Sequence, residues 1–347
     1  MAGDLPTHTQ ALVLKHDGYS ATATGPMLET AEDWLALDDI PLPPIGPDQV
    51  LIRVRRASVN PSDIHFIKGE YGQPRVAGAA AGFEGCGDVI AGPPALKGQR
   101  VAFVAGPNGS GAWAEYAVAD ATTCIPLRPE ISDDDGAAQI VNPLTARAMM
   151  GLAQEAGDAV IITAATSQLG KLMVALAGDM GLTLIATVRR KDAVADLKER
   201  GAAHVICTSD TDMDAQIKVA IGACKPRMML DAVCDPASEQ IFVAMPNGAR
   251  WVCYGKLSTD VPCLSQMGQL IFMNKRIEGF WLTQWMRTTP PADQIAAVRD
   301  VQERFADGRW STDVVATLSL REAMSELPAA LRKTDGKTMI APHREVF

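Results

Sequence analysis

The feature that most constrains the fold of this chain is a rhythm of short apolar runs separated by helical intervals, which begins near residue 158. Each run is almost continuously apolar, as a strand buried on both faces of a sheet requires. In the first interval Leu169, Leu172 and Leu176 recur at helical spacing. This alternation predicts βαβ units and a doubly wound parallel sheet, an α/β fold. The expected strands are 159–164, 183–188, 204–208, 227–232 and 250–254.

The sequence before this zone has a different pattern. From about residue 10 to 130, short β-rich runs such as "QVLIRVRRASV" (49–59) are separated by Gly and Pro clusters, which predicts a compact β-barrel-like domain. After the alternating zone we expect helices near 291–306 and 321–332, and a final strand in "GKTMIAP". The chain therefore holds two kinds of domain.

Composition restricts the class of partner. The chain has 347 residues, 47% of them hydrophobic, and a formal charge of −9, so it can bury a large core but has no excess of basic residues for a phosphate backbone. The N-terminus resembles no signal peptide, and no apolar run reaches the roughly 20 residues of a membrane span. Seven scattered cysteines without a C-x-x-C pair argue against a disulfide framework. We expect a cytoplasmic protein without nucleic-acid or membrane partners.

The segment "ATSQLG" (165–170) follows the first expected strand and opens a helix, which is the layout of a dinucleotide-binding turn. The three-glycine spacing G-x-G-x-x-G is absent, but glycine is needed only where a Cβ would obstruct, and Gly170 remains at the expected strand–helix contact. Backbone N–H groups and the positive helix end would face a pyrophosphate. The predicted cofactor-binding residues are Thr166, Ser167, Gln168 and Leu169, although an ordinary α/β turn has the same pattern.

The end of the second strand indicates which dinucleotide is bound. Arg189 and Arg190 stand about 20 residues after the turn, where a site for NAD carries an acidic residue. Guanidinium groups bind phosphate through hydrogen bonds worth roughly 1.5–3 kcal/mol each, so the pair favours NADPH over NADH. The alternative is that "RRK" is a solvated loop.

Seven segments in one order carry a family resemblance. They resemble the medium-chain dehydrogenase/reductase superfamily, and within it the zinc-independent branch of quinone oxidoreductases and 2-enoyl thioester reductases. The resemblance implies a GroES-like β-barrel catalytic domain (1–130 and 305–347) and a Rossmann NADPH-binding domain (131–304). The segments are "SVNPSDIHFIKGEYG" (58–72), "GFEGCGDVIAG" (82–92), "NPLTARAMM" (142–150), "ITAATSQLGKLM" (162–173), "GARWVCYGKLS" (248–258), "EGFWLTQWM" (278–286) and "GKTMI" (336–340).

The same segments depart from the zinc enzymes of the superfamily. Those enzymes place a Cys in the first segment and a His in a G-H-E segment, whereas this chain has Asn60 and Pro61 near the former and Phe83 at the latter. Phenylalanine binds no metal, and a catalytic zinc needs three protein ligands. We therefore expect no catalytic metal, which suits hydride addition to a polarised C=C bond.

The resemblance implies specific catalytic residues. Tyr71 matches the tyrosine implicated as proton donor in the enoyl thioester reductases, and Asn60 would hydrogen-bond near the nicotinamide or the substrate. A packing tyrosine and an Asn-Pro turn are the respective alternatives. Asp63 is expected to cap a helix that starts in "PSDIHF".

The resemblance also implies further cofactor contacts. Thr145 would lie near the nicotinamide, and Lys337 would reach the cofactor or a phosphate unless it is a surface lysine. Core or dimer packing is the alternative for the aromatic run. The remaining implied contacts are Tyr254, Gly255, Phe280, Trp281 and Leu282.

These interpretations rank three functions. The first is NADPH-dependent reduction of 2-enoyl thioesters or enones, the second is an NADPH:quinone oxidoreductase, and the third is a non-catalytic NADPH-binding protein. The resemblance also implies a homodimer joined by edge strands near 276–285.

Overall fold

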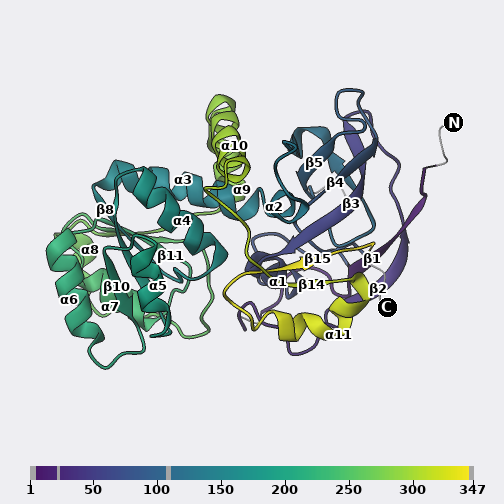
Figure 1. Cartoon of the computed structure of the whole chain (residues 1–347). Coiled ribbons are helices and arrows are strands. Elements are labelled where there is room, and N and C mark those ends of the chain that lie inside the picture. Colours follow the sequence, from purple (N-terminus) through teal and green to yellow (C-terminus); the bar gives the residue numbers. More distant parts are fainter. Residues whose placement is uncertain (1–4, 22–23, 107–110, 344–347) are drawn as a thin grey trace. The chain divides into compact units, whose positions relative to one another are not determined.

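The computed structural model describes residues 5–21, 24–106 and 111–343, and these form two compact units (Figure 1). One unit combines both chain ends, through Val141 and again from Gln302, and the other is Asn142–Val301. The chain-end residues 1–4 and 344–347 of the predicted barrel domain lie outside the described residues.

The second unit is built on a six-stranded sheet in the order β10-β9-β8-β11-β12-β13, and every neighbouring pair is parallel. The order reverses between β8 and β11, so the sheet is doubly wound, as predicted. The strands are β8 (Ala159–Ile162), β9 (Thr183–Val188), β10 (His204–Cys207), β11 (Met228–Asp231), β12 (Arg250–Cys253) and β13 (Arg276–Gly279).

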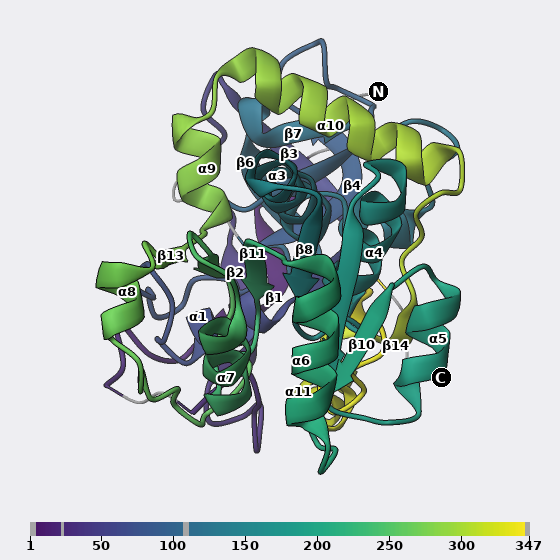
Figure 2. The same cartoon turned by 90° about the vertical axis from the view of Figure 1, so that its left-hand side faces the viewer.

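Helices flank this sheet in the turned view (Figure 2). After each βαβ unit the next strand runs in the same direction as the one before it. Asp192 is the N-cap residue of the helix after β9, but its carboxylate accepts from Arg190 Nε rather than from a helix N–H group. The helices are α3 (Val141–Ala156), α4 (Gln168–Asp179), α5 (Ala193–Glu199), α6 (Met213–Cys224), α7 (Pro236–Ala244), α8 (Gly268–Phe272), α9 (Leu282–Thr288) and α10 (Pro291–Ala306).

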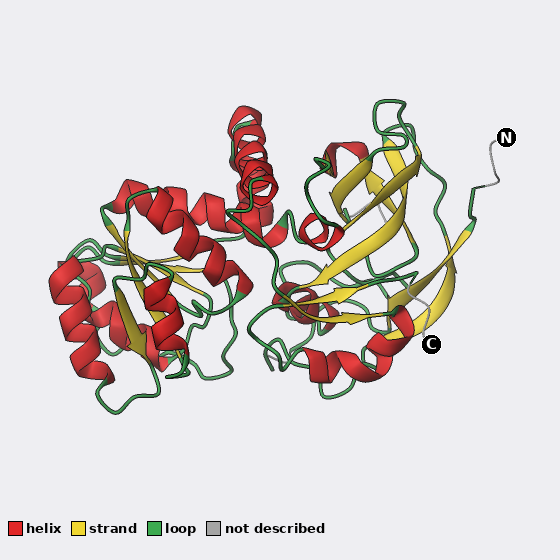
Figure 3. Cartoon of the chain, viewed as in Figure 1, coloured by secondary structure: helices red, strands yellow, loops and turns green. Residues whose placement is uncertain are grey.

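The first unit is the β-rich one (Figure 3). A seven-stranded sheet has the order β14-β15-β3-β4-β5-β7, and β6 pairs with β3. Strands β1 and β2 form a separate two-stranded antiparallel sheet and precede the larger sheet in sequence. Trp113, Phe103, Ile52 and Leu12 are fully buried in its core. The strands are β1 (His8–Leu14), β2 (Leu35–Pro41), β3 (Gln49–Val59), β4 (Glu84–Ala91), β5 (Arg100–Val104), β6 (Tyr116–Asp120), β7 (Cys124–Pro126), β14 (Val314–Leu318) and β15 (Lys337–Ile340).

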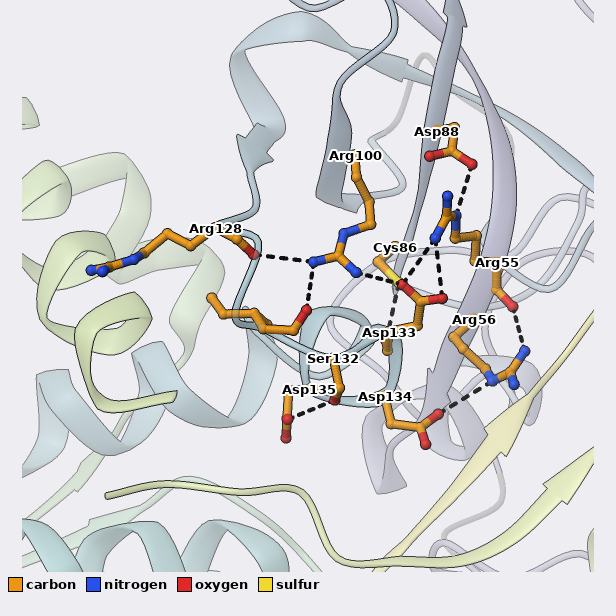
Figure 4. Close-up of polar contacts among 11 residues, drawn as sticks. Arg55, Arg56, Cys86, Asp88, Arg100, Arg128, Ser132, Asp133, Asp134 and Asp135 are labelled. Carbon is orange, nitrogen blue, oxygen red and sulfur yellow. Dashed lines mark hydrogen bonds and ion pairs between the residues drawn. The ribbon is translucent and has the colours of Figure 1, made fainter. Parts of the chain in front are cut away.

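Short helices complete this unit: α1 (Pro61–Ile67), the 3₁₀ turn η1 (Ala121–Thr123), α2 (Asp133–Ala137) and α11 (Leu320–Ala330). Charged side chains hold α2 against the sheet (Figure 4). The Asp133 carboxylate accepts from Arg100 Nη1 at 2.8 Å, and it also pairs with Arg55, whose Nε donates to Asp88 at 2.7 Å. These ion pairs are partly exposed, so they add little to the stability of the unit and mainly fix the position of α2 against the sheet.

The expected edge strands near 276–285 need a correction. Only Arg276–Gly279 is a strand, and α9 starts at Leu282. Trp281 has extended backbone at the helix N-cap, and Thr283 to Thr288 continue as a helix. The segment "EGFWLTQWM" (278–286) therefore contains the end of a strand, a turn and most of a helix.

Candidate functional site

The predicted cofactor residues of the second unit follow the carboxyl ends of its strands. Residues 166–169 follow β8, residues 189 and 190 follow β9, residues 254 and 255 follow β12, and residues 280–282 follow β13. All of these strands are parallel, so their carboxyl ends share one edge of the sheet. The strand order reverses between β8 and β11, which is where open α/β sheets bind ligands.

The turn from β8 to α4 shows how the chain manages without three glycines. Ser167 caps α4, and its hydroxyl accepts from the Gly170 N–H at 3.1 Å. A Cβ at Gly170 would lie 2.5 Å from the Ala165 carbonyl oxygen, so only glycine fits this contact. Ala164 adopts φ +49°, a left-handed conformation that glycine usually takes. The turn therefore contains a left-handed backbone conformation that glycine usually adopts, although the residue there is Ala164.

This turn suits a pyrophosphate group. The first N–H groups of an α-helix have no partner within the helix and carry the positive end of the helix dipole. Thr166, Ser167 and Leu169 are half-buried and Gln168 is 6% exposed, so the segment is accessible only in part. The predicted role of these four residues is compatible with this geometry and stays a prediction.

The arginines after β9 are exposed. Arg190 pairs with Asp192 at 3.2 Å, whereas the Arg189 guanidinium has no polar partner among the residues that the structure describes. A guanidinium without an ion-pair partner at this edge can bind a phosphate group without first breaking an ion pair. Of the two, Arg189 is therefore the better candidate for the 2′-phosphate.

Sequence reasoning missed the residue that organises the middle of this edge, Asp231. Its buried carboxylate accepts from the Thr163 hydroxyl at 2.6 Å, from Trp251 Nε1 at 2.8 Å and from the N–H groups of Val233 and Cys234. It thereby connects β8, β11 and β12 with the loop that follows β11. An acidic residue ending an apolar strand, in "MMLDAV", was the available signal.

Tyr254 and the aromatic run also lie at strand ends. The Tyr254 hydroxyl is buried, and no described residue hydrogen-bonds to it. Such an orphaned donor is uncommon, and a ligand or a water at this position would satisfy it. Arg287 lies 5.8 Å above the Trp281 ring, and the Phe280 N–H donates to the Cys253 carbonyl.

Thr145 is 8% exposed within α3, in the same unit. Its predicted contact with the nicotinamide stays a prediction.

In the first unit, Tyr71 belongs to an aromatic group with Phe66 and Phe83. The ring centroids of Tyr71 and Phe83 are 5.1 Å apart, and Phe66 meets the Tyr71 ring edge-on at 6.5 Å. Tyr71 is half-buried and follows Gly69, whose φ of +76° ends the turn after α1. The two phenylalanines fix the Tyr71 ring and leave part of the side chain accessible.

Asn60 and Lys337 lie in a buried polar network, and their predicted contacts with substrate or cofactor stay predictions. The Asn60 amide nitrogen donates to the Ser58 hydroxyl and to Glu84 Oε1, both at 2.9 Å, and its oxygen accepts from Lys337 Nζ. Asn60 is 1% and Lys337 4% exposed. Both amide N–H donors of Asn60 are thus engaged within the network. The surface position considered for Lys337 is wrong, because β15 carries it into the core.

Glu84 is the centre of this network, and sequence reasoning did not single it out. Oε1 accepts from Ser58 and Asn60, and Oε2 accepts from the N–H groups of Ile140 at 3.1 Å and Val141 at 2.8 Å. The pKa of Lys337 is lowered by burial, against the attraction of Glu84 and Asp63. A buried carboxylate with four donors and a buried cation is a satisfied unit.

Asp63 completes the network and starts α1. Its carboxylate accepts from the backbone N–H groups of Asn60 and Phe83, each at 2.7 Å, so it performs the predicted capping. Burial raises the pKa of Asp63 to about 7, against these hydrogen bonds, and the neighbouring Glu84 acts in the same direction as burial.

The residues at the position of a catalytic zinc do not fit the metal. Phe83 packs against Tyr71 and Phe66, and Asn60 is held by Ser58, Glu84 and Lys337. Across residues 5–21, 24–106 and 111–343, no group of three or more His, Cys, Asp or Glu side chains could hold a metal ion.

Comparison with known proteins gives the family. Residues 46–129 match the alcohol dehydrogenase GroES-like domain, and residues 169–297 match the family described as zinc-binding dehydrogenase. A crystal structure of a Mesorhizobium loti protein ascribed to the NADPH:quinone reductases is 48% identical, with a TM-score of 0.93, 98% of this chain covered and 100% of that chain.

Two more distant proteins are similar over most of their length. The human mitochondrial enoyl-[acyl-carrier-protein] reductase is 26% identical over 94% of this chain and 87% of its own. The structure of the Etr1p/NADP/crotonyl-CoA complex shares the fold, with a TM-score of 0.77, 22% identity, and coverage of 96% of this chain and 99% of that one.

The GroES-like β unit and the doubly wound parallel sheet together define an oxidoreductase of two-domain architecture. The chain belongs to the medium-chain dehydrogenase/reductase superfamily, among its enoyl and quinone reductases. In the part of the chain that the structure describes, every helix is too short or too polar to cross a membrane.

Proposed function

We propose that this chain is an NADPH-dependent reductase of activated C=C bonds, acting on 2-enoyl thioesters or enones without zinc. The observation that carries the proposal is the group of Phe66, Tyr71 and Phe83, in which an aromatic ring stands where a zinc ligand would be and packs 5.1 Å from the tyrosine that would donate a proton. The NADP and crotonyl-CoA of the Etr1p complex support the choice of cofactor and substrate class.

The residues have separate roles in this proposal. Bound NADPH would supply a hydride to the β-carbon of the substrate. The Tyr71 hydroxyl delivers a proton to the α-carbon, and its ring is kept in place by Phe66 and Phe83. The start of α4 binds the pyrophosphate, and Arg189 binds the 2′-phosphate.

Substrate assays with a tyrosine variant test the chemistry. We expect NADPH oxidation with crotonyl-CoA, and a loss of about 10²–10⁴-fold in kcat for Tyr71→Phe with unchanged NADPH affinity. Tyr19→Phe is the matched control, because Tyr19 is 62% exposed in the same unit and should keep full activity. Activity confined to 1,4-benzoquinone and 9,10-phenanthrenequinone would refute the enoyl assignment.

That outcome defines the second candidate, an NADPH:quinone oxidoreductase. It is favoured by the 48% identity to the Mesorhizobium loti protein, which exceeds the identity to the human enoyl reductase. In this case Tyr71→Phe should leave quinone turnover unchanged, since a quinone oxygen takes its proton from solvent.

Cofactor choice is tested at Arg189. A charge-assisted hydrogen bond to phosphate is worth roughly 1.5–3 kcal/mol, so Arg189→Ala should raise the Kd for NADPH about 10- to 100-fold and leave that for NADH unchanged. Arg200→Ala is the control, because Arg200 is an exposed arginine of the same unit that follows α5 and pairs with Asp196 four residues before it. An unchanged ratio of the two Kd values would show that Arg189 does not read the phosphate.

We further propose a homodimer formed through β13 and a cytoplasmic location. Strand β13 is one of the two edge strands of the parallel sheet, and Ile277 on it is 39% exposed. Nearby in sequence, Ile271 and Phe272 are 74% and 84% exposed. Large apolar side chains exposed next to each other are typical of an interaction surface. Sedimentation should show a dimer, and Phe272→Asp should shift it toward monomer; a monomeric wild type would contradict the proposal.

A further inference from the structure

Two cysteines that the proposed reaction does not use lie together at the carboxyl edge of the parallel sheet. Cys253 is the last residue of β12, and Cys234 lies in the loop after β11, the parallel neighbour in which Asp231 pairs in register with Cys253. Cys234 Sγ donates to the carbonyl of Gly255, two residues beyond Cys253, at 3.2 Å, and each of the two thiols shifts the pKa of the other. Both cysteines are partly exposed.

The backbone around Cys234 is held in an unusual conformation. Its φ is +56°, a left-handed value that costs a residue with a Cβ roughly 1 kcal/mol or more. The N–H groups of Val233 and Cys234 donate to Asp231, and that carboxylate is fixed in turn by Thr163 and Trp251. Such strain is retained where the surrounding structure over-determines it, often at functional sites.

The loop is also packed closely onto the end of β12. A Cβ at Gly255 would lie 2.9 Å from the Ala232 carbonyl oxygen, so the two backbones approach to contact distance. The Leu257 N–H donates to the same carbonyl at 2.9 Å, and the Tyr254 N–H donates to the Asp231 carbonyl at 2.9 Å. The fold therefore places the two thiols together through fixed backbones on both sides.

We propose that Cys234 and Cys253 form a redox-active thiol pair that a hydroperoxide converts into an intramolecular disulfide. The other described cysteines differ: Cys86, Cys124 and Cys207 are buried, Cys263 is exposed, and Cys224 is partly exposed at the end of α6.

The two thiols have different roles in this reaction. The neighbouring Cys234 side chain lowers the pKa of Cys253, whereas Cys253, burial and the nearby Asp231 carboxylate raise the pKa of Cys234. The Cys253 thiolate is thus the nucleophile and Cys234 the resolving thiol.

The chemistry balances in two steps. The Cys253 thiolate attacks one peroxide oxygen, the O–O bond breaks, and Cys253 sulfenic acid forms while the other oxygen leaves as an alkoxide or hydroxide that takes a proton from water. Cys234 sulfur then attacks the Cys253 sulfur, and the hydroxyl group leaves with the thiol proton as water. The two sulfurs together lose the two electrons that the O–O bond gains, and a dithiol reverses the reaction.

Peptide mapping of the full-length chain after hydrogen peroxide treatment tests the pair. We expect a linked peptide pair that joins Cys234 to Cys253, loss of two titratable thiols per chain, and full recovery after dithiothreitol. Cys234→Ser should accumulate a dimedone adduct on Cys253, Cys253→Ser should leave Cys234 alkylatable, and Cys263→Ser should behave as wild type.

The wild-type map decides the question even if a variant fails to fold. Oxidation in denaturing urea is its control, because an unfolded chain should link its cysteines without selectivity. A wild-type map that lacks the Cys234–Cys253 link, or that shows it only with the unselective links of the urea control, would overturn the proposal.

Discussion

Replacing Gly170 by alanine tests whether the contact between β8 and α4 defines the turn. An ideal Cβ at Gly170 would stand 2.5 Å from the Ala165 carbonyl oxygen and 2.7 Å from that of Ala164. Real Cβ atoms do not approach within 3.0 Å, and both obstacles are backbone atoms. The start of α4 or the turn itself must therefore move, and overpacking of this kind costs about 1–3 kcal/mol.

Gly178 provides the control on the same helix. A Cβ at Gly178 would have no atom within 4 Å, so Gly178→Ala gains helix propensity of up to about 1 kcal/mol without a clash. The same chemical change should thus lower the free energy of unfolding at residue 170 and raise it at residue 178, a difference of about 2–4 kcal/mol.

Urea unfolding and NADPH titration measure the two consequences. Gly170→Ala should also weaken NADPH binding, because it displaces the N–H groups at the start of α4, whereas Gly178→Ala should not. Equal and same-signed effects of the two substitutions on the free energy of unfolding would refute the reasoning from the close contact.

Two predictions concern the buried network. Glu84→Ala should lower the free energy of unfolding by about 3–5 kcal/mol in urea denaturation, because it removes a negative charge that attracts the buried Lys337 and frees four donors; a loss under about 1 kcal/mol would contradict this. The pKa of Asp63 is raised to about 7 from an ordinary 3.8, so the folded state holds this proton more tightly and the free energy of unfolding should fall as pH rises from about 4 to 7. In Asp63→Asn that part of the pH dependence should disappear, and an unaltered slope would show that Asp63 does not titrate there.

The sheet of the second unit could be predicted closely because its signal is local. Strand β9 occupies 183–188 and α10 occupies 291–306, as expected from a continuous apolar run and from a periodic helix. Strand β2 (Leu35–Pro41) was not predicted. Its middle is "LDDI", with two exposed aspartates, and only pairing with β1 makes it a strand.

The candidate site divides in the same way. The residues predicted to bind the cofactor could be placed at one edge of the second unit's sheet, because the carboxyl ends of parallel strands all lie at that edge. The contact between Asn60 and Lys337 joins residues 277 positions apart, and no local pattern reports it. The sequence predicted Asn60 near the nicotinamide or the substrate, and only the structure shows that its amide N–H donors have partners within the protein.

This buried network also explains how the first unit can keep the Glu84 carboxylate buried next to Phe83, a residue that binds no metal. Glu84 directly follows Phe83, and a buried carboxylate without compensation would destabilise the unit severely. Lys337 supplies the opposite charge from the far end of the chain, and Ser58, Asn60 and two backbone N–H groups saturate the oxygens. The charge balance is complete from protein groups alone. Phe83 stands where the resemblance implies a zinc ligand in the zinc enzymes of the superfamily; it adds no charge beside Glu84, and its ring packs against the tyrosine proposed as proton donor.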